Sequence, residues 1–414
     1  MIGTSLALAL SPLRLRVAVV EPVLRGAPEQ PSFDDRSTAL SRSTQRMFEA
    51  MGLWPEVVAS ATPIERIHVS DKGRFGFSHI DAEQQRVEAL GYVVINRVLG
   101  EVMHNGLEQI DDLDWLSPGR IVSLDRSLEA NIVTVEQGDS LRKLSCRLLV
   151  AADGANSKVR DMMGISAKQV PYHQVAVIGN LLPEKTIDNV AYERFTRTGP
   201  LAMLPIANHR AAFVWTLPPD EARRVLQLPD DDFSQQLHDA FGGRLGEFSK
   251  IGRRFAYPLV LSKANALIGR RSILVGNAAH GLHPVAAQGF NLGMRDVAAL
   301  CDCLYDAQQS AAIDSGIFEP GEVRVLERYA NWRRTDQRKV LRFTDGLLRL
   351  FSSSTKPVVA LRTVGMLGFD LIPGIRGLFA RHTMGLAGKL PRLSRGVPLA
   401  RTVNGGDRIK GAAG

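Results

Sequence analysis

The sequence of 414 residues has little of what several protein classes require. Its three cysteines, Cys146, Cys301 and Cys303, are too few and too unevenly spaced for a disulfide scaffold, which indicates a reducing compartment. No stretch reaches the ~18 uninterrupted apolar residues that a membrane-spanning helix needs. The apolar start, 1–10, is not preceded by the basic residues of a signal peptide, so we expect it to belong to the fold.

The composition is that of an ordinary globular protein whose charge is unevenly distributed along the chain. Apolar residues make up 45% and charged residues 23%, which excludes disorder, collagen and coiled coil and leaves room for two or three domains. The net charge is +8, and residues 340–414 hold twelve Lys and Arg against three Asp and Glu. The excess positive charge therefore belongs to the C-terminal segment, which is suited to acidic lipid, nucleic acid or an acidic partner.

The first 21 residues match the second half of a βαβ dinucleotide-binding unit. Residues 3–10 predict a buried helix that opens on Gly3, and the valine-rich run 15–21 predicts a parallel strand that ends at Glu21. In the full unit, a strand and two further glycines come first, so we expect them to be missing from this chain. A plain buried helix explains Gly3 about as well, but an acid roughly 20 residues after the turn suits the hydroxyls of an adenosine ribose.

Two later strands lead into further candidate ligand turns. Residues 148–152 predict a strand that runs into Asp153-Gly154, and 272–275 predict one that leads into Gly276-Asn277. Ligands of doubly wound sheets bind at such strand ends, although an Asp-Gly pair is also a common turn. The segments 191–216 and 255–262 alternate in the manner of antiparallel strands, and 297–307 has helical spacing.

Together these motifs resemble the FAD-dependent aromatic hydroxylases. The similarity is closest to the ubiquinone-biosynthesis hydroxylases, in the 2-octaprenyl-6-methoxyphenol hydroxylase branch, and it covers nearly the whole chain. It is carried by three segments: Ala279–Val297, Phe33–Ser41 and Gly199–Pro205. One departure is Asn277, which stands where the family usually has aspartate; its amide oxygen can still accept a hydrogen bond from a ribityl hydroxyl.

The resemblance implies an α/β fold. A Rossmann-like FAD-binding domain, truncated at its N-terminus, would comprise residues 1–165 and 265–335. A mainly antiparallel β substrate domain would be inserted at 166–264, and a basic helical segment would follow at 336–414.

The resemblance also implies the site. Gly3 would let the helix approach the FAD pyrophosphate, Glu21 would bind the ribose, and Pro284, Ala287 and Gly289 would lie beside the reacting ring as the catalytic set. The helix start at Gly289 would suit the anionic edge of reduced flavin. The full cofactor-binding set is Gly3, Glu21, Arg36, Arg97, Asp153, Gly154, Gly276, Asn277, Gly289, Asn291 and Leu292.

The implied activity is a monooxygenase reaction in ubiquinone biosynthesis. NAD(P)H would reduce FAD, and one atom of O2 would enter the ring of a polyprenylated methoxyphenol. An apolar tunnel for the prenyl tail is expected in the second domain, where Phe195, Leu201, Met203, Phe213 and Trp215 would line it or else form its core.

Other interpretations stay open. A halogenase or prenyl reductase of the same superfamily would keep FAD, but the halogenase Trp-x-Trp-x-Ile-Pro motif is absent. A non-catalytic relative would bind prenyl lipid or a biosynthetic complex, and the missing strand favours it. The pair His280 and His283 could suggest a metal site. Gly281 indicates a loop instead, and no cluster of Cys, Asp or Glu that could complete a metal site lies nearby in the sequence. Cys301 and Cys303 are expected to be buried and structural.

The basic C-terminal segment predicts a location. Its cations alternate with apolar residues, as in 347–351 and 375–381, and no basic module interleaved with aromatics suggests nucleic acid. We expect a cytoplasmic protein that is peripheral on the inner face of the bacterial membrane, where anionic lipid meets the cations. Helices that simply close the fold with a solvated basic face are the alternative.

Overall fold

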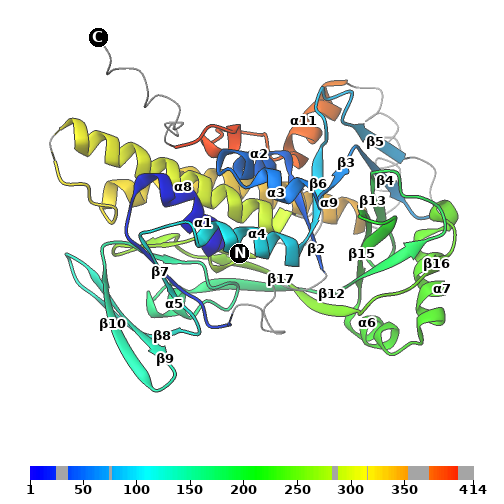
Figure 1. The fold of residues 1–414 in the computed structure, drawn as a ribbon. Coiled ribbons are helices and arrows are strands. Elements are labelled where there is room, and N and C mark those ends of the chain that lie inside the picture. The colour runs from blue at the N-terminus through cyan, green and yellow to red at the C-terminus, as the bar shows by residue number, and fades with distance from the viewer. Residues whose placement is uncertain (25–35, 74–76, 282–287, 315, 353–372, 400–414) are drawn as a thin grey trace, which may run out of the picture.

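The expected α/β architecture is confirmed by the computed structural model, in which a helical layer lies over β-sheets and a helical segment closes the chain (Figure 1). The residues that the structure describes are 1–24, 36–73, 77–281, 288–314, 316–352 and 373–399. The helices are α1 (Ile2–Leu10), η1 (Ser11–Leu13), α2 (Arg42–Ala50), α3 (Trp54–Val58), α4 (Asn96–Leu107), α5 (Lys158–Met162), α6 (Pro219–Leu226), α7 (Asp230–Phe241), η3 (Gly243–Leu245), η4 (Gly276–Ala278), α8 (Gln288–Ile313), α9 (Val323–Ser352), α11 (Pro373–Thr383) and η6 (Leu393–Arg395).

The strands form one large sheet and four small ones. They are β1 (Val17–Val20), β2 (Ser37–Ser41), β3 (Thr62–Ile64), β4 (Arg66–Asp71), β5 (Phe77–Asp81), β6 (Gly91–Ile95), β7 (Leu113–Leu116), β8 (Arg120–Arg126), β9 (Asn131–Gln137), β10 (Ser140–Cys146), β11 (Leu149–Ala151), β12 (Ala167–Pro183), β13 (Val190–Phe195), β14 (Pro200–Ile206), β15 (Arg210–Leu217), β16 (Phe248–Ser249), β17 (Phe255–Ala264), β18 (Ile268–Gly269), β19 (Ser272–Leu274) and β20 (His280–Gly281).

The predicted nucleotide-binding half consists of short parallel strands packed under helices. The expected helix is α1, and the three expected strands are β1, β11 and β19. β1 pairs in parallel with β7, and β11 pairs in parallel with β19. In the part of the chain that the structure describes, no strand joins these two pairs. Helix α1, buried from Thr4 to Leu10, packs between them and the helices α4 and α8 in one continuous apolar core.

The large sheet runs in the order β20-β17-β12-β15-β14-β13-β4-β5, with β16 added to β12. The alternating segments expected to be antiparallel are confirmed as β13, β14, β15 and β17. Two of its strands, β4 and β5, come from the first 165 residues, so both parts of the chain build the sheet.

One face of the large sheet is covered by α6 and α7 (Figure 1). Leu201, Met203, Phe213 and Trp215 point to this face and are buried against Phe233 and its neighbours on the helices. They belong to the core between the large sheet and these helices, which is the second of the two expectations for these side chains; Phe195 is buried but lies outside this cluster.

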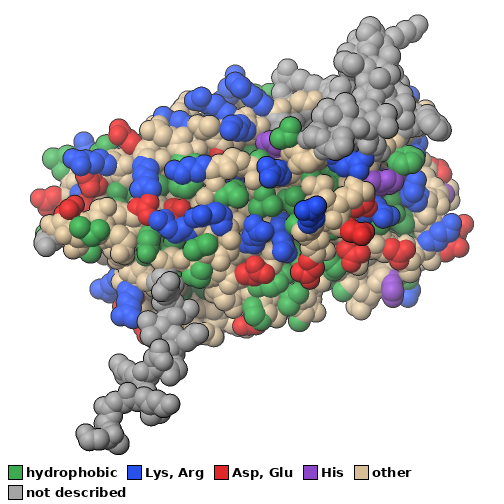
Figure 2. All heavy atoms as spheres, turned by 90° about the horizontal axis from the view of Figure 1, so that it is seen from above, with side chains coloured by type: hydrophobic (Ala, Val, Ile, Leu, Met, Phe, Trp, Pro, Cys, Tyr) green, Lys and Arg blue, Asp and Glu red, His purple; other side chains and the backbone are tan. Residues whose placement is uncertain are grey.

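The C-terminal helices close the nucleotide-binding half. Helix α9 begins at Val323 and packs along α8, where Cys301 and Cys303 are buried as expected. Figure 2 shows Lys and Arg side chains interspersed with apolar ones on the face seen from above Figure 1. None of the helices described by the structure combines the length and the apolar character needed to cross a membrane.

Candidate active site

The three sequence motifs meet at the N-terminal end of α1. A Cβ atom placed on Gly3 would lie 3.5 Å from the Cβ of Ala152, which directly precedes Asp153. A Cβ on Gly293 would lie 2.7 Å from Cδ1 of Ile2, and one on Gly276 would lie 3.2 Å from Cγ1 of Ile2. Gly276, with its positive φ, and Gly293 therefore pack closely against Ile2, whereas a Cβ on Gly3 would make only an ordinary contact.

Glu21 follows β1 and lies within electrostatic reach of the same helix end. Burial lowers the pKa of the Met1 amino group and the Glu21 carboxylate raises it, so the two charges are close together. The backbone N–H of Val23 donates to the Glu21 carboxylate at 3.2 Å. The first N–H groups of α1 have no partner within the helix, and they suit an anion.

The Asp153 carboxylate stabilises the start of helix α5. It is exposed and accepts hydrogen bonds from Ser157 Oγ and from the Val159 N–H at 3.1 Å, at the start of α5. Gly154 has φ +88°, which favours glycine. The turn therefore orders itself by capping a helix, as the alternative reading of the Asp-Gly pair expects.

Asp296 holds the third motif in place through hydrogen bonds to its buried carboxylate. It is fully buried, and its Oδ2 accepts the Gly276 N–H at 2.9 Å and lies 2.7 Å from His280 Nε2. Its Oδ1 accepts from Arg333 Nε at 2.6 Å and from Gln337 Nε2 at 3.3 Å. Burial alone would raise the pKa of Asp296, but the charges of Arg333 and His280 lower it to about 2. The network fixes Gly276, whose φ is +58°, against α8 and α9.

The same network explains His280. Its Nε2 lies 2.7 Å from the Asp296 carboxylate, and no cluster of three or more metal-ligating side chains occurs among the described residues. His283, Pro284 and Ala287 lie outside the described residues. Asp296 and Arg333 were not assigned from the sequence; the only available signal was the position of Asp296 inside the Ala279–Val297 segment.

Asn291 joins α8 to the β2–α2 junction. Its Oδ1 accepts from the Ser41 N–H at 2.8 Å and from Thr44 Oγ1 at 2.8 Å, and its Nδ2 donates to the Ala39 carbonyl at 2.8 Å. Leu292 is buried, and Asn277 is exposed. A Cβ on Gly289 would meet no described atom within 4 Å.

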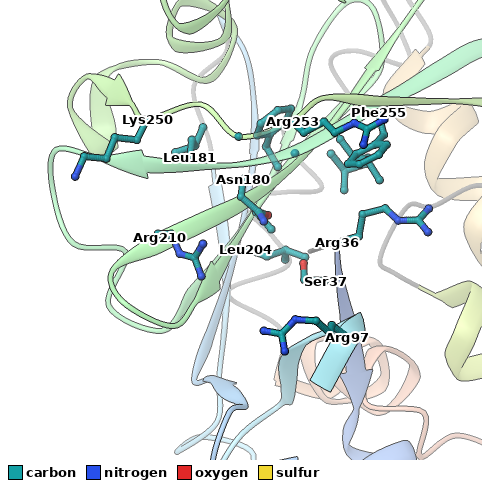
Figure 3. Close-up of a pocket in the computed structure, with 16 residues that line it drawn as sticks. Arg36, Ser37, Arg97, Asn180, Leu181, Leu204, Arg210, Lys250, Arg253 and Phe255 are labelled. Carbon is teal, nitrogen blue, oxygen red and sulfur yellow. The ribbon is translucent and has the colours of Figure 1, made fainter. Parts of the chain in front are cut away.

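A cavity of about 490 Å³ lies between the large sheet and the β2 and α4 elements (Figure 3). Its floor is the sheet face opposite α6 and α7, including Ile178, Leu204, Ala212 and Val214. Its other lining residues include five cations and no carboxylate. These cations are Arg36, Arg97, Arg210, Lys250 and Arg253.

The cavity cations come from two sides. Arg36 contacts the Tyr257 hydroxyl and stacks 5.1 Å from the centre of that ring, whereas Arg97 pairs with Glu101 at 3.2 Å. In Figure 3, Arg97 and Arg210 extend toward the same space from opposite sides, and Lys250 points away. The sequence singled out Arg36 and Arg97; it gave no signal for Arg210 and Arg253, which the antiparallel strands bring to this edge.

These residues fit a flavin dinucleotide. The N–H groups of the first turn of α1, Gly3 and Glu21 suit a pyrophosphate and a ribose, and Arg36 and Arg97, which the sequence assigns to the cofactor, line the cavity. These features involve residues that the sequence motifs assign to the cofactor.

Comparison with known proteins assigns the chain to a family. The family model described as "FAD binding domain" matches residues 1–342. A protein named ubiquinone hydroxylase UbiL from Rhodospirillum rubrum is 36% identical over 402 residues, which cover 96% of this chain and 91% of that protein. The 3-demethoxyubiquinol 3-hydroxylase of Escherichia coli is 29% identical and covers 93% of this chain and 96% of its own.

Solved structures show the same fold. The p-nitrophenol 4-monooxygenase PnpA of Pseudomonas putida matches with a TM-score of 0.75 at 17% identity, covering 94% of this chain and 96% of that one. PqsL of Pseudomonas aeruginosa, described as a probable FAD-dependent monooxygenase, matches with a TM-score of 0.70 at 22% identity, covering 89% and 96%.

Proposed function

Because the chain belongs to the FAD-binding family that contains the bacterial ubiquinone hydroxylases, we propose that it hydroxylates the aromatic ring of a polyprenylated methoxyphenol in ubiquinone biosynthesis. It is a flavin-dependent monooxygenase, with FAD as cofactor and NAD(P)H and O2 as co-substrates. The observation that carries the choice of an aromatic substrate is the apolar sheet floor of the 490 Å³ cavity, which adjoins the cofactor-binding motifs.

The residues that would hold FAD lie on several elements. The α1 end at Gly3 would bind the pyrophosphate, Glu21 the ribose, and the α8 start at Gly289 the pyrimidine edge, where a helix N-terminus favours negative charge. Arg36 and Arg97 would neutralise phosphate charge, and the turns at Asp153-Gly154 and Gly276-Asn277 would border the cofactor. When bound, FAD supplies the electron transfer and the activation of dioxygen.

The chain's own part in the reaction is to place the ring and keep water away. Ile178, Ala212 and Val214 present a flat, mostly aliphatic surface on which an aromatic ring can lie. Holding the ring carbon near the cofactor in a dry space removes the entropy of encounter and strengthens every local electrostatic interaction. Pro284 and Ala287 complete the proposed catalytic set with Gly289.

The cations that line the cavity and the basic C-terminal segment suggest two further partners, an anionic co-substrate and a membrane surface. Arg210 and Arg253 favour an anionic co-substrate such as NAD(P)H at the cavity mouth. Helix α11 exposes Leu378 at 64% beside the exposed Arg381, and such a mixture suits a surface of anionic lipid at the inner face of the bacterial membrane. Assembly with other ubiquinone-biosynthesis proteins there is part of the same proposal.

The experiment uses the purified protein. We expect a yellow protein that oxidises NAD(P)H faster when a prenylated methoxyphenol is added, and a product heavier by one oxygen atom in mass spectrometry. A folded but colourless protein would contradict FAD binding and would favour a non-catalytic relative. NAD(P)H oxidation that yields only hydrogen peroxide with every phenol tested would contradict the proposed substrate.

A further inference from the structure

Arg160 is a buried cation beside two turns that we call the second turn (Asp153-Gly154) and the third turn (Gly276-Asn277). Its side chain is 6% exposed, and its only ion pair within the described residues is with Asp161, at 3.6 Å, whose side chain is 68% exposed. Burying a guanidinium is costly unless its N–H groups find acceptors. The acceptors of Arg160 are two backbone carbonyl oxygens.

The two carbonyl groups belong to parts of the chain that are far apart in the sequence. Arg160 Nη1 donates to the Ala155 carbonyl at 3.1 Å and to the Ala278 carbonyl at 3.2 Å. Ala155 directly follows the second turn, and Ala278 directly follows the third turn. The two hydrogens of one nitrogen therefore bridge both turns, and the bond to Ala278 spans 118 residues of chain.

This bridge begins where the pairing of the two strands stops. β11 and β19 pair in parallel as far as Ala151 and Leu274, and each turn begins just beyond that point. The Val275 N–H then donates to the Ala151 carbonyl at 3.0 Å. Further along, no backbone hydrogen bond joins the two turns within the part of the chain that the structure describes. The Arg160 side chain is a direct hydrogen-bonded link between them.

The backbone of Arg160 is itself fixed. Its N–H donates to Ser157 Oγ at 3.0 Å at the start of α5, and its carbonyl accepts the Ile165 N–H at 3.1 Å. The Asp153 carboxylate accepts hydrogen bonds from Ser157 and Val159 at the same helix start. A side chain that extends from a backbone held in this way can fix the position of the groups that it binds.

The third turn is held at both of its ends. The Asp296 carboxylate accepts the Gly276 N–H at 2.9 Å, and Arg160 donates to the Ala278 carbonyl. Asn277 stands between these two anchors and is exposed. Buried side chains therefore hold the turn from inside and leave Asn277 at the sheet edge, where ligands of such folds bind.

We propose that Arg160 is a positioning residue for the cofactor, because it holds the second and third turns at the one separation at which FAD contacts both. It acts through the Ala155 and Ala278 carbonyl groups and need not touch FAD itself. Loss of the guanidinium leaves two carbonyl oxygens without their donor and lets the turns move apart, which weakens FAD binding. This inference rests on the proposed function, because it assumes that both turns border the cofactor.

The first test is the FAD affinity of the purified protein, followed by flavin fluorescence. Arg160→Met keeps the length of the side chain but cannot donate, so its Kd for FAD should rise about 30-fold. Arg160→Lys keeps a charged donor without the planar guanidinium and should restore most of the affinity, to a Kd about 5-fold above that of the wild type. A Kd of Arg160→Met within about twofold of the wild type would overturn the inference.

The matched control is Arg254→Met, in the sheet region. Arg254 is also largely buried, at 17% exposure, and its Nη1 donates to the Leu228 carbonyl at 2.9 Å. Arg254→Met should lower the free energy of unfolding and leave the Kd for FAD unchanged. An equal rise of Kd in the two methionine variants would mean that the loss follows from general destabilisation, and it would overturn the inference.

The second test locates the change in the molecule. Hydrogen exchange is measured by mass spectrometry on the FAD-saturated proteins. In Arg160→Met, and less strongly in Arg160→Lys, exchange should become faster in 153–157 and 276–279 together, because both turns lose the same anchor. Unchanged exchange, or faster exchange confined to α5, would overturn the inference. Arg160→Lys carries this test alone if the methionine variant does not fold.

The outcomes separate this inference from the proposed function. An active wild type whose Arg160→Met variant keeps the FAD affinity and the exchange rates would overturn the assignment of Arg160 alone. A wild type that binds FAD but hydroxylates no phenol would overturn the proposed reaction. If its Arg160→Met variant binds FAD more weakly and exchanges faster in both turns, the positioning role of Arg160 still stands.

Discussion

Two acidic residues lie deep in this molecule and differ in almost every respect. Asp296, in the α8–α9 region, is bound by Arg333, His280, Gln337 and a backbone N–H, and its pKa falls to about 2. Glu193, in the sheet region, has no hydrogen bond or ion pair with a described residue, and burial raises its pKa to about 7. A buried charge with a full set of partners holds a structure together, whereas a buried acid without partners is available for chemistry.

The largest expected effect is the loss of Asp296. Asp296→Ala leaves the Arg333 guanidinium buried beside one fewer anion, so the free energy of unfolding should fall by about 3–5 kcal/mol. FAD binding should weaken as well, because Gly276 loses the acceptor that fixes its turn. The measurement is urea unfolding followed by circular dichroism, with flavin fluorescence for binding.

The control for this variant is another aspartate in an ion pair. Asp220 pairs with Arg223 on the surface, and its side chain is 91% exposed. Asp220→Ala should change the free energy of unfolding by less than about 1 kcal/mol. Equal stability of the two alanine variants would contradict the structural role given to Asp296.

Substitution of Glu193 is expected to raise the free energy of unfolding above neutral pH, not to lower it. Since its folded pKa lies above the usual value of 4.5, the folded state loses stability as the pH rises from about 4.5 to 7. Glu193→Gln cannot ionise, so at pH 8 it should be more stable than the wild type by about 3 kcal/mol, with little difference at pH 4. Unfolding midpoints measured at both pH values check this, and a variant that is less stable at pH 8 would show that Glu193 is paired.

An intermediate loss of stability is expected at Asn291. Its side chain makes three hydrogen bonds that join α8 to β2 and α2, and Asn291→Ala should leave buried groups without partners at a cost of about 2 kcal/mol. Asn291→Asp keeps the two accepted bonds but places a buried carboxylate oxygen against the Ala39 carbonyl, so it should lose at least as much stability. Unfolding curves of Asn291→Ala that match those of the wild type would contradict the role of Asn291 in joining these elements.

The sequence predicts the fold far better than the partners of its polar residues. Local patterns suffice for α1, β1 and β11, because apolar runs and turns are local signals. The partners of Asp296 lie up to 41 residues away along the chain, and the surroundings of Glu193 depend on the pairing of β13 with β14 and β4. No local pattern encodes such contacts, so neither acid stands out in the sequence.

The same contrast extends to two arginines, and it predicts the smallest effect on stability. Arg333 is buried and forms ion pairs with Asp296 and Asp336, whereas Arg210 lies half-buried at the cavity and forms no ion pair with a described residue. Arg210→Gln removes a cation that pairs with no carboxylate among the described residues, so the free energy of unfolding should change by less than about 1 kcal/mol. The KM for NAD(P)H should rise about 5-fold, since that corresponds to about 1 kcal/mol of charge attraction, and Arg210→Lys should restore most of it. A loss of stability in Arg210→Gln as large as that in Asp296→Ala would show that Arg210 has a structural role. The distinction between paired and unpaired buried groups would then not hold for cations.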